Sequence, residues 1–190
     1  MAQALAHGHT IHAGFRGTET PAAPGLTAMA CDATNIQDVR QLIAGCDAVV
    51  SVIGHIKGSP PRVQTEAMHA LCAAMEQEGV RRLVSLTGTG VRQPGDTIPL
   101  ADRLLNLLVS IVDPARVRDG RDHVAVLEAS DLEWTVVRVL KLQQRSSGPV
   151  VLSAHGPTRL FVSRDAVATA ILDVLEAHSF IRQMPILSRS

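Results

Sequence analysis

Apolar residues in this chain switch repeatedly between two spacings, and this alternation is the feature that most restricts its fold. Short apolar runs of strand length occur at residues 47–53 (DAVVSVI) and 81–87 (RRLVSLT), and longer stretches with helical spacing lie between such runs. This switching is typical of βα units rather than of a β-sandwich or a helical bundle. The two runs end at Gly54 and Gly88, as expected of central strands covered on both faces. We therefore expect an α/β fold with a mostly parallel sheet.

The same spacings place the remaining elements. Further strands are expected at residues 10–15 and 26–30 near a sheet edge, at 133–140 in the centre and at 184–187, with 150–153 as a weaker candidate. Helices are expected at residues 36–44, 63–78, 100–112, 119–130 and 167–177, because their apolar positions recur at helical intervals. Asn35 and Ser163 are suited to cap two of these helices, and Gly45 and Gly79 to end two. Residues 143–148 (QQRSSG) are expected to form a polar loop.

Composition limits the classes of partner. An apolar share of 46% over 190 residues is enough for one domain with its own core. The 18 Lys and Arg balance the 18 Asp and Glu, so no net charge attracts nucleic acid or an anionic membrane. No apolar run reaches the length of a membrane span and residues 1–9 lack the features of a signal peptide, so we expect a cytoplasmic protein. Cys31, Cys46 and Cys72 are widely spaced in Ala-rich or apolar surroundings, which favours reduced, buried thiols.

Six short strings carry a resemblance that extends over nearly the whole chain. They are ALAHGH at 4–9, FR at 15–16, CDAT at 31–34, GCDAVV at 45–50, VRRLVS at 80–85 and SDLEWTVVR at 130–138. In this order and spacing the chain resembles the atypical short-chain dehydrogenases of the NmrA-like and biliverdin-reductase-B-like group, which bind NAD(P)H. The resemblance implies a single Rossmann-like domain over residues 1–190, built as a three-layer sandwich around a mostly parallel sheet.

In that family, a first strand and a glycine-rich turn, Gly-x-x-Gly-x-x-Gly, precede the helix that ends in a string like residues 4–9. The turn anchors the cofactor's pyrophosphate through backbone amides and the positive end of the helix. Neither occurs in this sequence, so we expect an incomplete N-terminus, a sheet without its first strand, and weak or lost dinucleotide binding. Two explanations stay open: Met1 is an internal start in a longer protein, which we favour, or the chain is a degraded relative.

The resemblance assigns two groups of residues to the cofactor. Arg16, just past a strand, lies where a guanidinium meets the 2′-phosphate of NADP, so NADP is expected and NAD is the alternative. A solvated surface Arg would look the same in the sequence. Asp32 and Ala33 correspond to residues that flank the adenine, although an Asp there can also lead a helix. Nearer the nicotinamide, the resemblance assigns Ser51, Val52, Ile53, Gly54, Thr87 and Gly88 at the ends of two central strands.

The candidates for catalysis are Thr87 and His123. Ordinary short-chain dehydrogenases pass a proton from a Tyr whose pKa is lowered by a nearby Lys, but this chain contains no Tyr. The Thr87 hydroxyl would instead bond a nicotinamide ribose or a substrate carbonyl, or it would only complete the turn. His123 suits acid–base chemistry near neutral pH, or it is a half-buried residue without a role. His7, His9 and His12 lack the spacing of a metal site, so no metal is expected.

Three functions fit these residues. The first is an NADPH-dependent oxidoreductase that transfers hydride between nicotinamide and a small carbonyl, quinone or flavin-like acceptor. The second is a non-catalytic dinucleotide-sensing or partner-binding regulator of the NmrA-like kind, which the lack of a clear proton donor favours. The third is the fold alone, without a cofactor. We expect a small-molecule substrate, no nucleic-acid or membrane partner, and a monomer or homodimer, with the apolar helix at 100–112 serving as core or as an interface.

Overall fold

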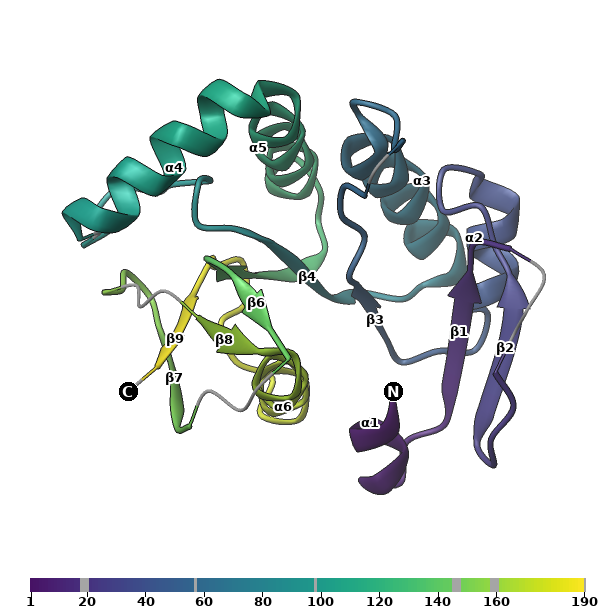
Figure 1. Cartoon of the computed structure of the whole chain (residues 1–190). Helices are drawn as coiled ribbons and strands as arrows, with labels where there is room; N and C mark the ends of the chain where they lie inside the picture. The colour runs from purple at the N-terminus through teal and green to yellow at the C-terminus, as the bar shows by residue number, and fades with distance from the viewer. Residues whose placement is uncertain (18–20, 57, 98, 145–147, 158–160, 190) are drawn as a thin grey trace.

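The computed structural model describes residues 1–17, 21–56, 58–97, 99–144, 148–157 and 161–189. Its helices are α1 (Ala2–Ala6), α2 (Ile36–Ile43), α3 (Val63–Glu78), α4 (Leu100–Val112), α5 (Pro114–Glu128) and α6 (Arg164–Glu176). Its strands are β1 (Ile11–Phe15), β2 (Leu26–Ala30), β3 (Ala48–Ser51), β4 (Arg82–Gly88), β5 (Glu133–Val139), β6 (Leu142–Gln143), β7 (Val150–Ser153), β8 (Val162–Ser163) and β9 (Ile186–Arg189). Strands and helices alternate along much of the chain (Figure 1), as the sequence predicts.

The largest sheet has five strands in the order β3-β4-β5-β9-β7. In this sheet β3, β4, β5 and β9 run parallel, and β7 pairs antiparallel with β9. The central strands β4 and β5 pair over their whole length, from Arg82 opposite Glu133 to Gly88 opposite Val139. The predicted α/β class with a mostly parallel sheet is therefore confirmed.

Helices cover both faces of this sheet. Side chains of a strand point alternately to its two faces, so Trp134 and Val136 of β5 join one core cluster while Val137 and Val139 join the other. The first cluster contains side chains of α2, α3 and α5, and the second contains side chains of α6. The result is a helix–sheet–helix sandwich of the Rossmann-like kind, as expected.

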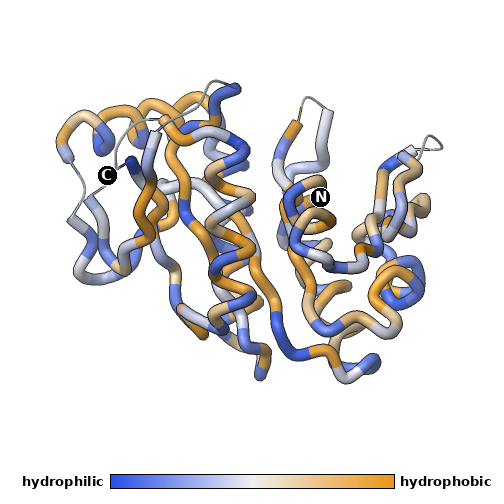
Figure 2. The backbone as a smooth tube through the Cα atoms, turned by 90° about the horizontal axis from the view of Figure 1, so that it is seen from below, coloured by the Kyte–Doolittle hydropathy of each residue, from blue (hydrophilic) through white to orange (hydrophobic). Residues whose placement is uncertain are grey.

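The sheet is divided beside β3. Strands β1 and β2 form a separate parallel pair, and among the described residues β3 pairs only with β4. Figure 1 shows β1 next to β3 with no strand drawn between them, and Figure 2 shows the part that holds the N-terminus beside the part that holds the C-terminus. The described residues thus place no strand between β1 and β3, in agreement with the expectation of a sheet without its first strand. The facing edges of β1 and β3 therefore present backbone groups without a strand partner in the described part of the chain.

One face of β3 is open to solvent. Val49 packs against the cluster that contains α3, but Val50 is 43% exposed and Val52 is 64% exposed. The prediction that residues 47–53 are covered on both faces is therefore wrong. It is right for β4, whose Leu83 and Val84 are fully buried on opposite faces. The physical reason is that α6 packs on β4, leaving the same face of the edge strand uncovered.

Helix ends follow the capping residues. Asn35 and Ser163 cap α2 and α6 as predicted, by accepting hydrogen bonds from amides one turn into each helix. Because Ser163 is the cap, α6 begins at residue 164 rather than at 167. Likewise α5 begins at Pro114 rather than at residue 119, because Asp113 caps a first turn that holds a Pro. Gly79 ends α3 in the left-handed conformation, with φ of 72°.

A few further predictions differ from the structure. The last strand covers residues 186–189 rather than 184–187. The paired strands β6 and β8 have two residues each, too few for a sequence period to detect, and β6 takes the first residue of the predicted loop at 143–148. Residues 145–147 of that loop lie outside the described residues. No helix within the described ranges has both the length and the apolar character needed to cross a membrane.

The three cysteines are free thiols, as predicted. Each is partly buried, and none takes part in a disulfide. Burial raises the pKa of Cys72 to about 11, and it also raises the pKa values of Cys31 and Cys46. Because the thiolate is the reactive form of cysteine, these raised pKa values fit unreactive side chains.

Candidate functional site

Strands β3 and β4 bring the predicted nicotinamide-side residues to one edge of the five-stranded sheet. Ser51 of β3 pairs in register with Ser85 of β4, so the segments that follow leave the sheet side by side. Gly54 and Gly88 are exposed in these segments, whereas Ser51 and Thr87 are buried. Val52 is open to solvent and Ile53 is partly buried, its carbonyl accepting from the Gln64 side chain at 2.8 Å. Carboxyl ends of parallel strands are where open α/β sheets bind ligands.

The adenine-side residues lie at the ends of β1 and β2. Phe15 and Ala30 are paired at these ends, so Arg16 and the turn at Asp32 follow neighbouring strands. The Asp32 carboxylate accepts from the Thr34 amide at 2.9 Å and from its hydroxyl at 2.7 Å. These bonds lower the pKa of Asp32, with a small contribution from Arg16. Asp32 thus leads α2, as the alternative interpretation proposed, while Ala33 is partly buried beside it.

The two groups belong to two sheets. Arg16, Asp32 and Ala33 follow strands of the two-stranded sheet, while the residues after β3 and β4 follow strands of the five-stranded sheet. No strand pairing joins these sheets in the described part of the chain. The structure therefore places both predicted groups at carboxyl ends of parallel strands, with the division of the sheet between them.

Thr87 of β4 and His123 of α5, the candidates for catalysis, are both buried where α5 packs on β4. Thr87 is 7% exposed, and a Cβ added at Gly120 of α5 would lie 3.2 Å from its hydroxyl oxygen. His123 is 1% exposed, its Nδ1 lying 3.0 Å from the Gly120 carbonyl and its Nε2 3.1 Å from the Ser85 hydroxyl. Because a carbonyl only accepts, Nδ1 carries the proton and the Ser85 hydroxyl donates to Nε2. Burial lowers the pKa of His123, so the ring is neutral at neutral pH.

A buried carboxylate, missed by the sequence reasoning, organises the segment after β3. Asp119 of α5 accepts from the amides of Gln64 and Thr65 at 2.9 Å each, from the Thr65 hydroxyl, and from His55 Nε2 at 2.7 Å. Burial by itself raises the pKa of Asp119, but the hydrogen bonds from Thr65, Gln64 and His55 outweigh it and hold the pKa below its ordinary value. The first amides of α3 are thus bonded within the protein rather than free for an anion.

A pocket of about 320 Å³ is lined in part by His55, the imidazole partner of this carboxylate. Its lining residues come from the segment after β3 and from the start of α5, and they are His55, Ile56, Ser59, Pro61, Asp113, Ala115 and Arg116. The guanidinium of Arg116 donates to the His55 carbonyl at 2.8 Å, which fixes one wall. The partners in this cluster are separated by 54 to 64 positions in the sequence, so no local spacing reveals it.

The start of α4 closes the end of β4. Asn106 donates to the buried Asp102 carboxylate at 2.6 Å and to the Thr89 hydroxyl at 3.3 Å, which ties the helix to the residue after β4. The other side of α4 is apolar and open to solvent. Its large apolar residues are between 56% and 80% exposed, and they are Leu100, Leu104, Leu107, Leu108, Ile111 and Val112. Of the two roles proposed for this helix, core is therefore excluded.

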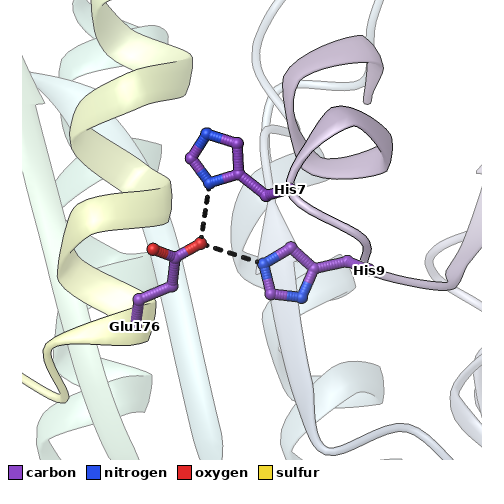
Figure 3. A group of neighbouring side chains, drawn as sticks. All are labelled: His7, His9 and Glu176. Atoms are coloured by element: carbon purple, nitrogen blue, oxygen red, sulfur yellow. Dashed lines mark hydrogen bonds and ion pairs between the residues drawn. The ribbon is translucent and has the colours of Figure 1, made fainter.

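The amino-terminal histidines do not behave as one cluster. His7 and His9 both contact the carboxylate of Glu176, at the end of α6 (Figure 3). His12 instead bonds the Leu42 carbonyl at 2.9 Å. Spacing in the sequence could not show this meeting, because Glu176 is 167 or more positions away.

Comparison with known proteins identifies the family. A family model described as NAD(P)H-binding matches residues 1–178. The chain belongs to this NAD(P)H-binding family. The match covers most of the 190 residues and includes all the predicted cofactor-side positions. No curated protein sequence matches the chain.

Solved structures of NAD(P)H-binding and related proteins share the fold. A short-chain dehydrogenase/reductase from Veillonella parvula in complex with NADP has a TM-score of 0.72 at 21% identity, covering 88% of this chain and 73% of that one. The oxidoreductase YlbE from Lactococcus lactis has a TM-score of 0.77 at 18% identity, covering 95% and 80%. ChuY, an anaerobillin reductase from Escherichia coli O157:H7, also has a TM-score of 0.77 at 18% identity, covering 99% and 88%. At these identities the likeness confirms the Rossmann-like fold.

Proposed function

We propose that this member of the NAD(P)H-binding family is an NADPH-dependent oxidoreductase acting on a small carbonyl, quinone or flavin-like acceptor. The observation that carries the proposal is the shared carboxyl edge of β3 and β4, where Gly88 ends β4, Gly54 lies three residues beyond the end of β3, and both glycines are exposed. Glycines there leave the backbone accessible to a ribose or nicotinamide. The NADP complex of the Veillonella parvula protein and the reductase activity in the name of ChuY support the same chemistry.

Arg16 supports NADPH rather than NADH. Its side chain is exposed, and no carboxylate of the described residues lies within ion-pair distance of it. A guanidinium in that state offers a bidentate contact to a 2′-phosphate, which NADH lacks. Asp119 occupies the first amides of α3, so we expect the cofactor's phosphates to bind elsewhere than at the start of this helix.

The burial of Thr87 and His123 restricts the chemical class of the hydride acceptor. When bound, the nicotinamide supplies the hydride. Neither buried side chain offers a proton at the exposed edge, so an acceptor that takes its proton from water fits best. Quinones and flavin-like rings meet this condition better than simple carbonyls. The pocket beside His55 and Arg116 adjoins the edge, and we place the acceptor there.

A second candidate function is dinucleotide sensing without turnover. It is favoured by one observation: both ring nitrogens of His123 are engaged inside the protein, with the Ser85 hydroxyl and the Gly120 carbonyl. In this function the bound cofactor would bias contact with a partner, and the exposed apolar side of α4 would be available for it. Binding of NADPH without oxidation by any acceptor would favour this candidate.

Calorimetric titration with NADPH and NADH tests the cofactor. NADPH should bind more tightly than NADH, and Arg16→Gln should lower the NADPH affinity about tenfold or more while leaving NADH unchanged. Arg121→Gln, an exposed substitution on α5, is the matched control and should change neither affinity. Equal affinities for both nucleotides would contradict the role of Arg16. Loss of NADPH absorbance with quinones or flavins then tests turnover, and Arg116→Gln should raise KM for the acceptor only.

A further inference from the structure

His7, His9 and Glu176 form a compact set of metal-ligand groups. Among the described residues they are the one group of three or more His, Cys, Asp or Glu side chains whose ligand atoms all lie within 4.8 Å of one another. His7 Nδ1 is 2.9 Å from Glu176 Oε1, and His9 Nε2 is 3.1 Å from the same oxygen. Figure 3 shows both imidazole rings directed at that carboxylate. We propose that these three residues bind a divalent zinc ion.

The local backbone presents both rings to one point. His7 ends α1, and Gly8 follows it with a φ of 87°, a left-handed conformation that a side chain would strain. The Gly8 and His9 amides donate to the carbonyls of Leu5 and Ala4, which closes the turn. This single-residue turn is why two histidines separated by one glycine face the same way.

The anchoring of α1 holds the two histidines against α6. Gln3 donates to the Asp165 carbonyl at 3.2 Å and accepts from the Thr169 hydroxyl at 3.2 Å, both on α6. Leu5 lies against the turn at Gly25, before β2. The ligand groups are thus positioned by contacts other than their own hydrogen bonds, as a preorganised metal site requires.

The chemistry of the three groups suits zinc. Two neutral imidazoles and one carboxylate are a common zinc ligand set, and they leave a fourth position for water. Zinc–ligand distances of about 2.0–2.2 Å separate tetrahedral ligand atoms by roughly 3.3–3.6 Å, so the present 2.9 and 3.1 Å need to lengthen by about half an ångström or less. Without metal, each of these two ring nitrogens donates a hydrogen bond to Glu176. When zinc binds, the metal takes the place of the N–H hydrogen at each nitrogen.

Charge and exposure favour a cation at this place. The Glu176 carboxylate supplies the negative charge, and a nitrogen of each imidazole lies within hydrogen-bond distance of one of its oxygens. Glu176 is the last residue of α6, where the negative end of the helix attracts cations. The side chains are 43–46% exposed, which gives an ion direct access from solvent.

The position of the site gives it a structural consequence. His9 directly precedes the segment that enters β1, in the two-stranded sheet, whereas α6 packs on β4 of the five-stranded sheet. These sheets share no strand pairing in the described residues. Zinc bound to His7, His9 and Glu176 would therefore clamp the two parts together on the face where Val50 is open.

Zinc titration of the chain, freed of any purification tag and without dinucleotide, tests the proposal. One Zn²⁺ should bind per chain, and His9→Gln or Glu176→Gln should each lower its affinity at least about tenfold. His69→Gln is the matched control, since His69 is an exposed histidine on α3, and it should leave the affinity unchanged. Equal affinity in the wild type and Glu176→Gln would overturn the proposal.

The alternative zinc position is at His12, whose Nδ1 lies 3.6 Å from the thiol sulfur of Cys46. His12→Gln should retain zinc binding, and loss of binding in this variant instead would overturn the assignment. Thermal unfolding provides the second measurement: saturating zinc should raise the Tm of the wild type and of His69→Gln but not that of Glu176→Gln. Because all three ligand side chains are exposed, these variants should fold as the wild type does.

Discussion

His55 Nε2 lies 2.7 Å from the carboxylate of Asp119, and this contact joins the segment after β3 to α5. The same carboxylate accepts the amides of Gln64 and Thr65 at the start of α3. One side chain thus fixes three segments that border the carboxyl edge of the sheet. Arg62, the residue before α3, makes no capping hydrogen bond with its side chain. The Asp119 carboxylate caps the start of α3 in its place.

Replacing Asp119 should be strongly destabilising. In Asp119→Asn, a side-chain amide takes the place of one carboxylate oxygen and confronts donors that need an acceptor, so buried groups lose their partners. We expect the free energy of unfolding to fall by about 2–4 kcal/mol, measured by urea denaturation. Asp173→Asn, exposed on α6, is the matched control and should change it by less than about 0.5 kcal/mol. A loss of similar size in both variants would show that the hydrogen bonds of Asp119 are not the cause.

The free energy of unfolding should fall at acid pH because Asp96 becomes protonated. Burial by itself raises the pKa of this carboxyl, but the bidentate contact with the fully buried Arg138 and the Gln93 amide outweigh it, so the pKa lies below its ordinary value of 3.8. A carboxyl with a lowered pKa stabilises the fold fully above the unfolded-state pKa, and this contribution is lost as the pH falls through the folded-state pKa.

The measurement is the urea midpoint of the wild type and of Asp96→Asn at several pH values. The gap between them should be constant from neutral pH down to about pH 5 and should shrink below 3.8. A gap that stays the same at acid pH would contradict a stabilising role for the ionised Asp96.

The sequence predicted those elements whose signal is local. Residues 63–78 and 100–112 have helical spacing, and the structure confirms both helices at these bounds. The β4 and β5 strands follow from continuous apolar runs, since both faces are covered. Residues 47–53 have the same kind of run, yet Val50 is exposed because coverage depends on distant neighbours rather than on the run itself.

The candidate sites could be predicted only in part, for the same reason. Arg16 and Gly54 follow the strands β1 and β3, where a resemblance can place them. Asp119 acts through partners more than 50 positions away, and Glu176 meets His7 across 169 positions. The titration range of histidine makes His123 a candidate, but its burial depends on how closely α5 approaches β4, which no local pattern encodes.

Gly120 allows α5 to approach β4 closely, and the substitution Gly120→Ala tests this role. In most helices this change stabilises by up to about 1 kcal/mol. Here the new Cβ would lie 3.2 Å from the Thr87 hydroxyl and 3.3 Å from a Val91 methyl carbon, both buried. Because both neighbours are buried and would have to shift to admit the methyl group, we expect a net loss of about 1 kcal/mol or more in the free energy of unfolding. Thr87→Ala removes one clash, so Gly120→Ala should cost less in that background, and an unchanged cost would contradict this explanation.

Hydrogen exchange should reveal the division of the sheet. Residues Arg82–Ser85 of β4 pair on both edges, with β3 and β5, so their amides should exchange slowly. β3 pairs with β4 on one edge, and its other edge faces β1 without a strand partner in the described residues. Alternate amides of a parallel strand point to opposite edges, so β3 should show slow and fast exchange in alternation, measured amide by amide by NMR. Uniform protection of β3, equal to that of β4, would mean that its edge is covered in solution.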